Sequence, residues 1–209
     1  MDQSGVPVIR RATEHDIADM ARIIARAFAS DDPIEEYVFP DVGNRHRRSP
    51  RMLRIMIRYR FLPAGGAAVS TVDGKIVGAL LWYPAGYRKS IWREAISGPL
   101  LLWAMGAGTT RGIHVDNAIA EVRPEQGHHF MVYLGADPTV QRSGVGRSLV
   151  NWLDALADQR GETVGGICKD GNMPYYATFG YELVRRVRIG STGPEMNFVL
   201  RQPVPVPSE

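Results

Sequence analysis

The stretch LGADPTVQRSGVGRSLV, residues 134–150, decides the fold of this chain. Before it, apolar residues alternate at Phe130, Val132 and Leu134, as in a half-buried strand. Asp137-Pro138 ends that alternation, and from Val145 onward apolar residues recur with helical spacing. The stretch is therefore predicted to be a strand, a glycine-containing turn and a helix.

Two glycines in the predicted turn favour the close approach of an anion. Gly144 and Gly146 lack a Cβ, so the neighbouring backbone N–H groups can point inward at the positive end of the following helix. Arg142 and Arg147 add positive charge at the same place. A glycine turn that binds nothing has the same local sequence, so the rest of the chain must decide between the two interpretations.

Two nucleotide-binding motifs do not fit this turn. The dinucleotide motif G-x-G-x-x-G needs a third glycine, and that position is Leu149. The P-loop needs a lysine after its last glycine, and no lysine follows Gly144 or Gly146. The sequence thus excludes both motifs at this site.

The turn resembles motif A of the GNAT superfamily of acetyl-coenzyme A dependent N-acyltransferases, [QR]-x-x-G-x-[GA], through Gln141, Gly144 and Gly146. Three more stretches are similar to the puromycin N-acetyltransferase-like branch of that superfamily, in the same order along the chain: AFASDDPIEEYVFPD (27–41), HHFMVYLGADP (128–138) and GNMPYYATFGYELV (171–184). The chain departs from the pattern at Arg142, Ser143 and Tyr181, where glycine, a basic residue and phenylalanine are usual.

The resemblance implies a mixed α/β fold whose mostly antiparallel sheet splits into a V where the motif strand leaves its neighbour. It implies acetyl-coenzyme A as co-substrate, with the pyrophosphate on the turn and the pantetheine arm along the motif strand. The cofactor-binding residues that it implies are Leu134, Gly135, Ala136, Gln141, Arg142, Ser143, Gly144, Val145, Gly146, Arg147 and Asn172.

Tyr176 is the candidate general acid, because it aligns with the tyrosine four residues before the last glycine of the family pattern. A phenol with a pKa of about 10 can protonate a thiolate whose thiol has a pKa of about 8.5 without a large mismatch. The alternative is that Tyr175, Tyr176 and Phe179 form only an aromatic core cluster.

The general base is left open by the sequence. An alkyl amine with a pKa of about 10.4 is neutral in only about one molecule in a thousand at pH 7, a cost of about 4 kcal/mol, so a proton acceptor helps. His128, at the start of the motif strand, is the first candidate. The other candidates are all acidic residues or histidines near the expected acceptor side: Asp31, Asp32, Glu35, Glu36, His114, Asp116 and Glu121.

The composition indicates a single soluble domain. The chain has 209 residues, 44% hydrophobic and 22% charged, which is ordinary globular usage. We expect one domain over residues 1–202, a helical insertion at about 88–124 that lines the acceptor side, and a disordered proline-rich tail at 203–209.

The longest apolar run, residues 99–107, is far shorter than the roughly 20 residues of a membrane span, and no signal peptide is recognisable. A single cysteine, Cys168, agrees with a reducing compartment, so we expect a cytoplasmic protein without a membrane partner and without a metal.

Seven arginines lie between residues 45 and 60 with no acid among them, while the whole chain has a net charge of +3. Their spacing predicts an amphipathic helix. A patch for nucleic acid or a membrane is one interpretation, but a solvated face or a contact with an acidic part of the same fold is commoner, so nucleic acid is not the expected partner.

The remaining elements are predicted from periodicity and turn signals. Strands are expected at 8–10, 67–72, 75–82, 163–168, 181–189 and 196–200, and helices at 14–28, 90–105, 113–120 and 173–179.

The predicted function is transfer of an acetyl group from acetyl-coenzyme A directly to a primary amine of a small molecule, with antibiotic-like compounds and amino-nucleosides as examples. Acetylation of a protein or peptide, and a catalytically silent acyl-coenzyme A binding module, are the alternatives. The aromatic and apolar insertion would suit an apolar acceptor, but it would equally suit a homodimer interface.

Overall fold

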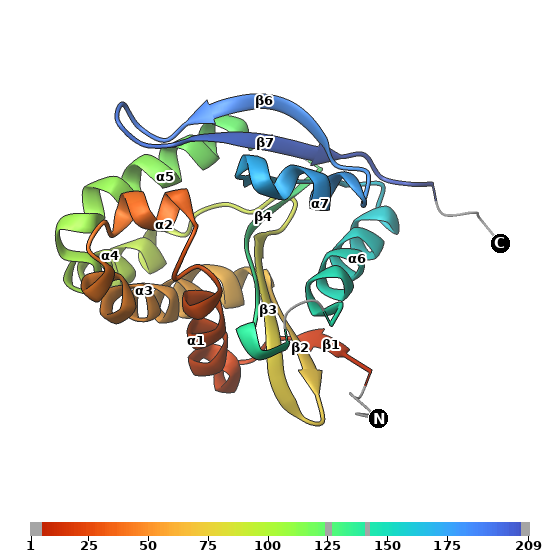
Figure 1. Cartoon of the computed structure of the whole chain (residues 1–209), viewed down its shortest axis with the longest axis horizontal. Coiled ribbons are helices and arrows are strands. Elements are labelled where there is room, and N and C mark those ends of the chain that lie inside the picture. The colour runs from red at the N-terminus through yellow and green to blue at the C-terminus, as the bar shows by residue number, and fades with distance from the viewer. Residues whose placement is uncertain (1–5, 124–126, 141–142, 206–209) are drawn as a thin grey trace.

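The computed structural model describes residues 6–123, 127–140 and 143–205. One seven-stranded sheet organises these residues, in the order β1-β2-β3-β4-β5-β7-β6 (Figure 1). Neighbouring strands are antiparallel except for the central pair β4 and β5, which are parallel. The strands are β1 (Val8–Arg11), β2 (Ala67–Val72), β3 (Lys75–Tyr83), β4 (His128–Ala136), β5 (Thr163–Cys168), β6 (Glu182–Arg188) and β7 (Glu195–Arg201). The predicted mixed α/β fold with a mostly antiparallel sheet is confirmed.

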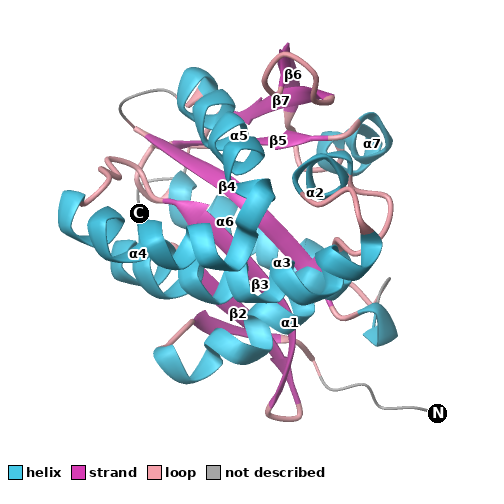
Figure 2. Ribbon diagram, turned by 90° about the vertical axis from the view of Figure 1, so that its left-hand side faces the viewer, coloured by secondary structure: helices cyan, strands magenta, loops and turns pink. Residues whose placement is uncertain are grey.

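Helices cover both faces of this sheet, as Figure 2 shows for the α1, α3, α4 and α5 side with α6 behind. The helices are α1 (Ile17–Ala27), α2 (Pro33–Val38), α3 (Val42–Met56), α4 (Ile91–Met105), α5 (Thr109–Val122), α6 (Val145–Asp158) and α7 (Met173–Ala177). All the predicted helices and strands are present within a few residues. Among the described helices, none is long and apolar enough to cross a membrane.

The predicted arginine-rich helix begins and ends differently from the expectation. It starts at Val42, because the Asp41 side chain accepts a hydrogen bond from the Asn44 backbone N–H at 2.7 Å and so caps α3. At its other end the helix widens into a π-helical turn, Ile57–Phe61. Within this turn Arg60 is buried, while Arg54 and Arg58 are exposed.

The central strands β4 and β5 separate after four paired residues. Residues 128–131 of β4 pair with residues 163–166 of β5, and no further pair follows along β4. On the other edge of β4, Leu81 pairs with Tyr133 and Trp82 with Met131, so Val132 is an extra residue, a β-bulge. Because a bulge bends its strand, β4 turns away from β5 at this point, and α2 and α7 lie across the opening (Figure 2). The predicted V-shaped split is therefore present.

Gly135 allows α1 to lie directly on β4. A Cβ at Gly135 would be 3.2 Å from the Cα of Ile24 and 3.3 Å from the Cβ of Ala27. Both contacts are tighter than ordinary van der Waals contact, so a larger residue would push the helix off the strand. The glycine that the resemblance assigns to the cofactor thus has a packing role in the fold.

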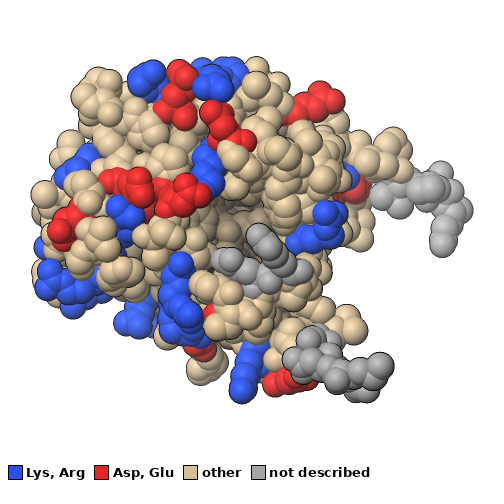
Figure 3. All heavy atoms as spheres, in the orientation of Figure 1, with Lys and Arg blue, Asp and Glu red and all other residues tan. Residues whose placement is uncertain are grey.

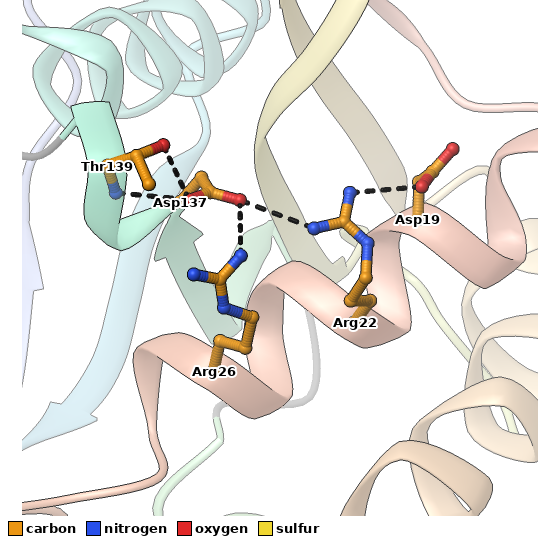
Figure 4. A network of polar contacts seen from close by, with 5 residues as sticks. All are labelled: Asp19, Arg22, Arg26, Asp137 and Thr139. Atoms are coloured by element: carbon orange, nitrogen blue, oxygen red, sulfur yellow. Dashed lines mark hydrogen bonds and ion pairs between the residues drawn. The ribbon is translucent and has the colours of Figure 1, made fainter.

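Asp137 ties the end of β4 to α1 and to the turn that follows (Figure 4). Its Oδ2 accepts hydrogen bonds from Arg22 Nη1 at 3.3 Å and Arg26 Nη1 at 3.1 Å. Its Oδ1 accepts from the Thr139 backbone N–H at 3.0 Å and from Thr139 Oγ1 at 2.8 Å. Burial alone would raise the pKa of Asp137, but these hydrogen bonds and the two arginines outweigh it and lower the pKa.

The chain continues in an ordered way beyond residue 202, where the sequence predicts a disordered tail. The Val204 backbone N–H donates to Asp158 Oδ1 at 2.8 Å, and Arg201 Nη1 donates to the same oxygen at 2.8 Å. A carboxylate can accept several hydrogen bonds, so Asp158 holds both groups against α6. Residues 203–205 have no helix or strand and are attached through Val204, while residues 206–209 of the predicted tail lie outside the described part of the chain.

We predict that Asp137→Ala lowers the free energy of unfolding by about 1–3 kcal/mol, because it removes a buried carboxylate that accepts hydrogen bonds from Thr139 and from two arginines. Urea unfolding followed by circular dichroism measures this change. Asp19→Ala is the matched control, since Asp19 contacts Arg22 from an exposed position and should cost less than about 0.5 kcal/mol. Equal effects of the two substitutions would contradict the anchoring role of Asp137.

Candidate active site

A cavity of about 550 Å³ lies where β4 leaves β5. Its sheet side is formed by residues 130–134 of β4 and residues 166–168 of β5, and its other walls come from α2, α3, α4 and α5. Both helices of the predicted insertion contribute, for example through Leu101 and Ile119. A cavity of this size, with mostly apolar walls, is typical of a site for a small molecule.

The glycine turn lies at the N-terminus of α6, beside the end of β4. Gly144 has φ +86° and is the residue before the first helical residue, a conformation that favours glycine. A Cβ at Gly144 would meet no atom of the described residues within 4 Å. The space beside the turn is therefore open to a ligand. The N–H groups of the first helical turn have no intrahelical acceptor and carry the positive end of the helix dipole, an environment that favours an anion.

The other predicted residues of the turn lie as follows. Val145 is buried and packs against Gly78 of β3, so it holds the start of α6 on the sheet. Ser143 Oγ donates to the Val140 carbonyl at 2.5 Å. Leu134 lines the cavity, and Ala136 ends β4. Gln141 and Arg142 lie outside the described residues.

Helix α7 connects the turn with the cavity. A Cβ at Gly146 would lie 3.1 Å from the Tyr175 hydroxyl, and the Arg147 guanidinium lies 4.9 Å from the ring centre of Phe179. On its other side, α7 and the turn before it present Asn172 and Tyr176 to the cavity. The structure thus brings together the predicted phosphate turn, Asn172 and Tyr176 around one opening.

Tyr176 belongs to an aromatic cluster and also reaches the cavity. Its ring makes edge-to-face contacts with Tyr175 at 5.4 Å and with Tyr181 at 5.6 Å. Burial raises the pKa of Tyr176, with smaller contributions from Cys168 and Tyr175. The hydroxyl is therefore protonated at neutral pH, and the site is compatible with both predictions for this residue, an acid and a packing residue.

His128 lies away from the cavity. It stands at the closed end of the split, where its Nδ1 is 2.8 Å from Thr163 Oγ1 and its ring packs near Phe198. Burial, then the neighbouring His129, lowers the pKa of His128 to about 4. His128 is not among the residues that line the cavity, so the structure does not bring it together with Tyr176.

Glu35 is the buried acid of the cavity. Only 4% of it is exposed, and its Oε1 accepts a hydrogen bond from Ser49 Oγ on α3. The pKa of Glu35 is raised to about 7, and burial is the largest cause. The Ser49 hydrogen bond and Arg45 favour the charged carboxylate and oppose this rise, whereas the nearby Asp32 adds to it. A carboxyl group with a pKa near 7 can take up and release a proton at neutral pH.

Asp32 lines the same part of the cavity as Glu35 but has a structural partner. Its Oδ1 accepts the Glu35 backbone N–H at 2.8 Å and so caps α2. Burial raises the pKa of Asp32 as well. Acidic side chains gather over α2 in Figure 3, and this cluster gives that part of the cavity a negative potential that would favour a cationic ligand.

The remaining acid and histidine candidates have polar partners of their own, and Asp116 is the one among them that also lines the cavity. Asp116 accepts from Arg60 Nη1 at 2.9 Å, and the His114 ring is hydrogen-bonded to Tyr37 at 2.7 Å. Asp31 lies 2.5 Å from Lys169 Nζ across the opening of the split, and Glu121 accepts from Arg185 at 3.0 Å on the surface. Of the eight candidates for the base, Glu35 is therefore the one that combines access to the cavity with a pKa near neutrality.

Tyr133 is a site residue that the sequence analysis missed. It follows the bulge at Val132, lines the cavity, and packs edge-on against Phe28 at 5.6 Å. Burial raises the pKa of Tyr133 well above its usual value, and Glu35 contributes next. The alternation of β4 could have indicated this residue, but only once the bulge had fixed which side chains face the split.

Cys168 lines the cavity as a buried thiol. Burial, followed by Asp170, raises its pKa to about 11, and its Sγ lies 3.6 Å from Met173 Sδ. A thiol with this pKa is almost fully protonated at neutral pH and is a poor nucleophile. Cys168 therefore packs in the cavity wall as a small apolar side chain.

Comparison with solved structures identifies the fold. A Corynebacterium glutamicum protein named histone acetyltransferase HPA2 and related acetyltransferase superposes with a TM-score of 0.73 at 20% identity, covering 97% of this chain and 99% of that one. A polyamine N-acetyltransferase from Drosophila melanogaster has a TM-score of 0.62 at 13% identity over 94% of this chain and 100% of that one. A GCN5-related N-acetyltransferase from Rhodopseudomonas palustris has a TM-score of 0.57 at 17% identity, covering 97% of this chain and 99% of that one. No family model and no curated protein matches the chain. The protein therefore has the fold of the GNAT acetyltransferases that its sequence resembles.

We predict that Glu35→Gln stabilises the protein at alkaline pH. The pKa of Glu35 is about 7 in the folded chain and about 4.3 when unfolded, so its charge destabilises the fold progressively from about pH 4 to pH 7 and constantly above. Glutamine keeps the acceptor for Ser49 and carries no charge. The variant should be more stable by about 2 kcal/mol at pH 8 and equal to the wild type near pH 4.

Urea unfolding at both pH values measures this difference. Glu36→Gln is the matched control, because Glu36 is an exposed neighbour on the same helix and its removal should change stability little at either pH. A Glu35→Gln protein that is less stable than the wild type at pH 8 would contradict the raised pKa.

Proposed function

We propose that the protein is an acetyl-coenzyme A dependent N-acetyltransferase that acetylates a primary amine of a small molecule. The observation that carries the proposal is the arrangement around the split: a glycine turn at the start of α6, Tyr176 beside it, and Glu35 in the cavity that the split opens. An anion site, a proton donor and a proton acceptor along one cleft are what acyl transfer to an amine requires. The fold shared with known acetyltransferases supports the same activity.

The residues at the split fit the co-substrate. The open space beside Gly144 and the N–H groups of the first turn of α6 would hold the pyrophosphate. Along β4, residues 132–136 have no strand partner on the β5 side, so Leu134 and Ala136 would hydrogen-bond to the amide groups of the pantetheine arm. Acetyl-coenzyme A, when bound there, supplies the acetyl group as a thioester.

The walls of the cavity favour a small acceptor over a protein chain. Two helices of the insertion, α4 and α5, close the side of the cavity opposite β4, and the cavity holds about 550 Å³. Its apolar walls suit the body of the acceptor, while Glu35 and Asp32 suit a cationic amine. Structural neighbours include enzymes that act on polyamines and agmatine, which are small amines.

Glu35 acts as the general base. An amine enters mostly as its ammonium form and must lose a proton before it can attack a carbonyl group. Glu35 accepts this proton directly or through one water, and the Ser49 hydrogen bond stabilises the carboxylate. Tyr133, close enough to Glu35 for the carboxylate to raise its pKa, orients the amine toward β4.

Tyr176 acts as the general acid, donating its hydroxyl proton to the sulfur as the carbon–sulfur bond breaks. The raised pKa keeps the phenol protonated until the thiolate forms, although it also weakens the driving force. Transfer is direct from the thioester to the amine, because the neighbouring Cys168 is a protonated thiol.

We predict that Glu35→Gln lowers kcat/KM by about 10²–10⁴-fold, the range for loss of a general base. In the wild type, kcat/KM should rise with pH through an apparent pKa of about 7, and this limb should be absent in the variant. Steady-state release of coenzyme A across pH measures both. Ser49→Ala should move the limb to higher pH, because the hydrogen bond that favours the carboxylate is lost.

The matched control is Glu36→Gln, which should keep both the rate and the pH profile. If Glu35→Gln retains the wild-type profile, the base is another group.

We predict a smaller effect for Tyr176→Phe, about 10-fold to 100-fold on the chemical step, because a thiolate can also leave unaided. Single-turnover measurement isolates that step from product release. Tyr175→Phe is the matched control, since it removes a hydroxyl from the same aromatic cluster. Unchanged single-turnover rates in Tyr176→Phe would assign this residue to packing.

The activity itself is tested with a panel of small primary amines and a panel of short peptides, both scored by amine-dependent release of coenzyme A. The proposal expects turnover with small amines. Turnover only on peptide N-termini would favour a peptide acetyltransferase. Binding of acetyl-coenzyme A without turnover on either panel would favour a silent binding module.

A further inference from the structure

Helix α4 presents a broad apolar face to solvent. Trp92, Ile96 and Trp103 are 83%, 55% and 69% exposed and lie along one side of the helix, with Ile91 and Leu102 beside them. On the opposite side of the same helix, Leu101 and Met105 are buried and line the cavity. The helix is therefore apolar around most of its circumference, although about half of it faces outward. A helix of this kind is usually covered by another apolar surface.

A row of arginines lies next to this apolar face. Four exposed arginines recur at spacings of four, three and four residues: Arg47, Arg51 and Arg54 on α3, and Arg58 on the π-helical turn that continues it. The Arg51 guanidinium lies 5.4 Å from the ring centre of Trp103, so the arginine row and the apolar face of α4 form one continuous surface. Basic side chains gather at the lower left of Figure 3, where α3 and α4 lie.

The position of this surface is fixed by contacts between the two helices. Arg48 Nη1 donates to the Ala104 carbonyl at 3.0 Å near the C-terminal end of α4. Near its N-terminal end, Glu94 lies 3.2 Å from Arg60 Nε. The two helices are therefore antiparallel neighbours, and the arginine row runs along the apolar face.

The charge of this surface is strongly one-sided. No acidic residue occurs between residues 42 and 61, and Glu94 is the one acid between residues 88 and 113. Glu94 is paired with Arg60, so it does not offset the exposed arginines. Arg93 adds a further exposed positive charge on α4 itself.

We propose that the α3–α4 surface docks on the surface of an anionic lipid bilayer. Tryptophan, isoleucine and leucine side chains insert at the level of the headgroups, where the amphipathic indole ring is favourable, while the arginines contact the lipid phosphates. The contact is peripheral and needs no membrane-spanning helix. The expectation of no membrane partner rested on the short apolar runs of the sequence, which do not reveal that α3 and α4 combine into one face.

Other occupants fit this surface less well. A second copy of the chain would bring the same surface, and within residues 42–61 and 88–113 the one acid of that surface, Glu94, is already paired with Arg60, so it cannot pair with the arginine row. Single-stranded nucleic acid would suit arginine and tryptophan, but it would leave Ile91, Ile96 and Leu102 exposed to water.

Sedimentation of the full-length protein with vesicles tests the proposal. We expect binding to vesicles of phosphatidylcholine mixed with phosphatidylglycerol, weaker binding as salt rises, and little binding to phosphatidylcholine alone. Binding should also shift tryptophan fluorescence to shorter wavelength, because Trp92 and Trp103 leave water. This assay needs neither acetyl-coenzyme A nor an amine, so its result is independent of the proposed catalytic function.

Paired variants identify the surface. Arg51→Gln with Arg54→Gln should weaken binding about 25-fold, at about fivefold for each arginine near an anionic surface. Trp92→Ser with Trp103→Ser should weaken it at least about tenfold and remove the fluorescence shift. The matched controls are exposed residues of β6, far from α3 and α4 in the chain. Arg185→Gln with Arg188→Gln, and Leu183→Ser with Val184→Ser, should bind like the wild type. Circular dichroism checks that each variant is folded.

Three results would overturn the proposal. The first is no binding to anionic vesicles at low salt, and the second is binding that the α3 and α4 variants leave unchanged. The third is a dimer, or a complex with single-stranded DNA, that forms in place of vesicle binding and is lost in the Trp92→Ser and Trp103→Ser protein.

Discussion

The separation of β4 from β5 is the constraint on which the rest of the structure depends. Four residue pairs hold the two parallel strands together, and the bulge at Val132 then bends β4 away. Where the two strands separate, the backbone N–H and C=O groups on the facing edges of β4 and β5 lose their partners in the sheet, and the cavity lies between these edges. The cavity, the glycine turn beyond β4 and the approach of α7 all follow from this geometry. Asp137 fixes the far end of the bent strand to α1 and so maintains the opening.

Charge is distributed unevenly around this opening. At the start of α6 the helix end is positive, which suits phosphates, whereas the α2 side of the cavity holds Glu35 and Asp32 and suits a cation. Burial keeps Glu35 close to its protonation midpoint at neutral pH, and Ser49 prevents the pKa from rising further. An anionic co-substrate and a cationic acceptor would thus meet from opposite ends of one cleft.

Local signals in the sequence were sufficient to predict the strand, turn and helix at residues 134–150, because alternation and glycine act over short distances. The overall fold was predicted from the four stretches that resemble the GNAT superfamily and from their order along the chain. Which acid serves as base could not be predicted, since Glu35 is distinguished from Glu36 only by burial and by Ser49, which α3 brings to it. Likewise, strand alternation could not show that His128 packs near Phe198 at the closed end of the split. Arg58 and Arg60 are two residues apart and so face opposite sides of the helical turn, and only the packed structure shows that the Arg60 side is the buried one.

The most direct test of the account is hydrogen exchange of the backbone amides with and without acetyl-coenzyme A. Binding in the split would protect residues 132–136 of β4, which have no partner on the β5 side, together with residues 143–148 at the start of α6. The account predicts slower exchange in both segments, with little change in β1 and β2 at the far edge of the sheet. Unchanged exchange in both segments at saturating acetyl-coenzyme A, or protection confined to another region, would contradict it.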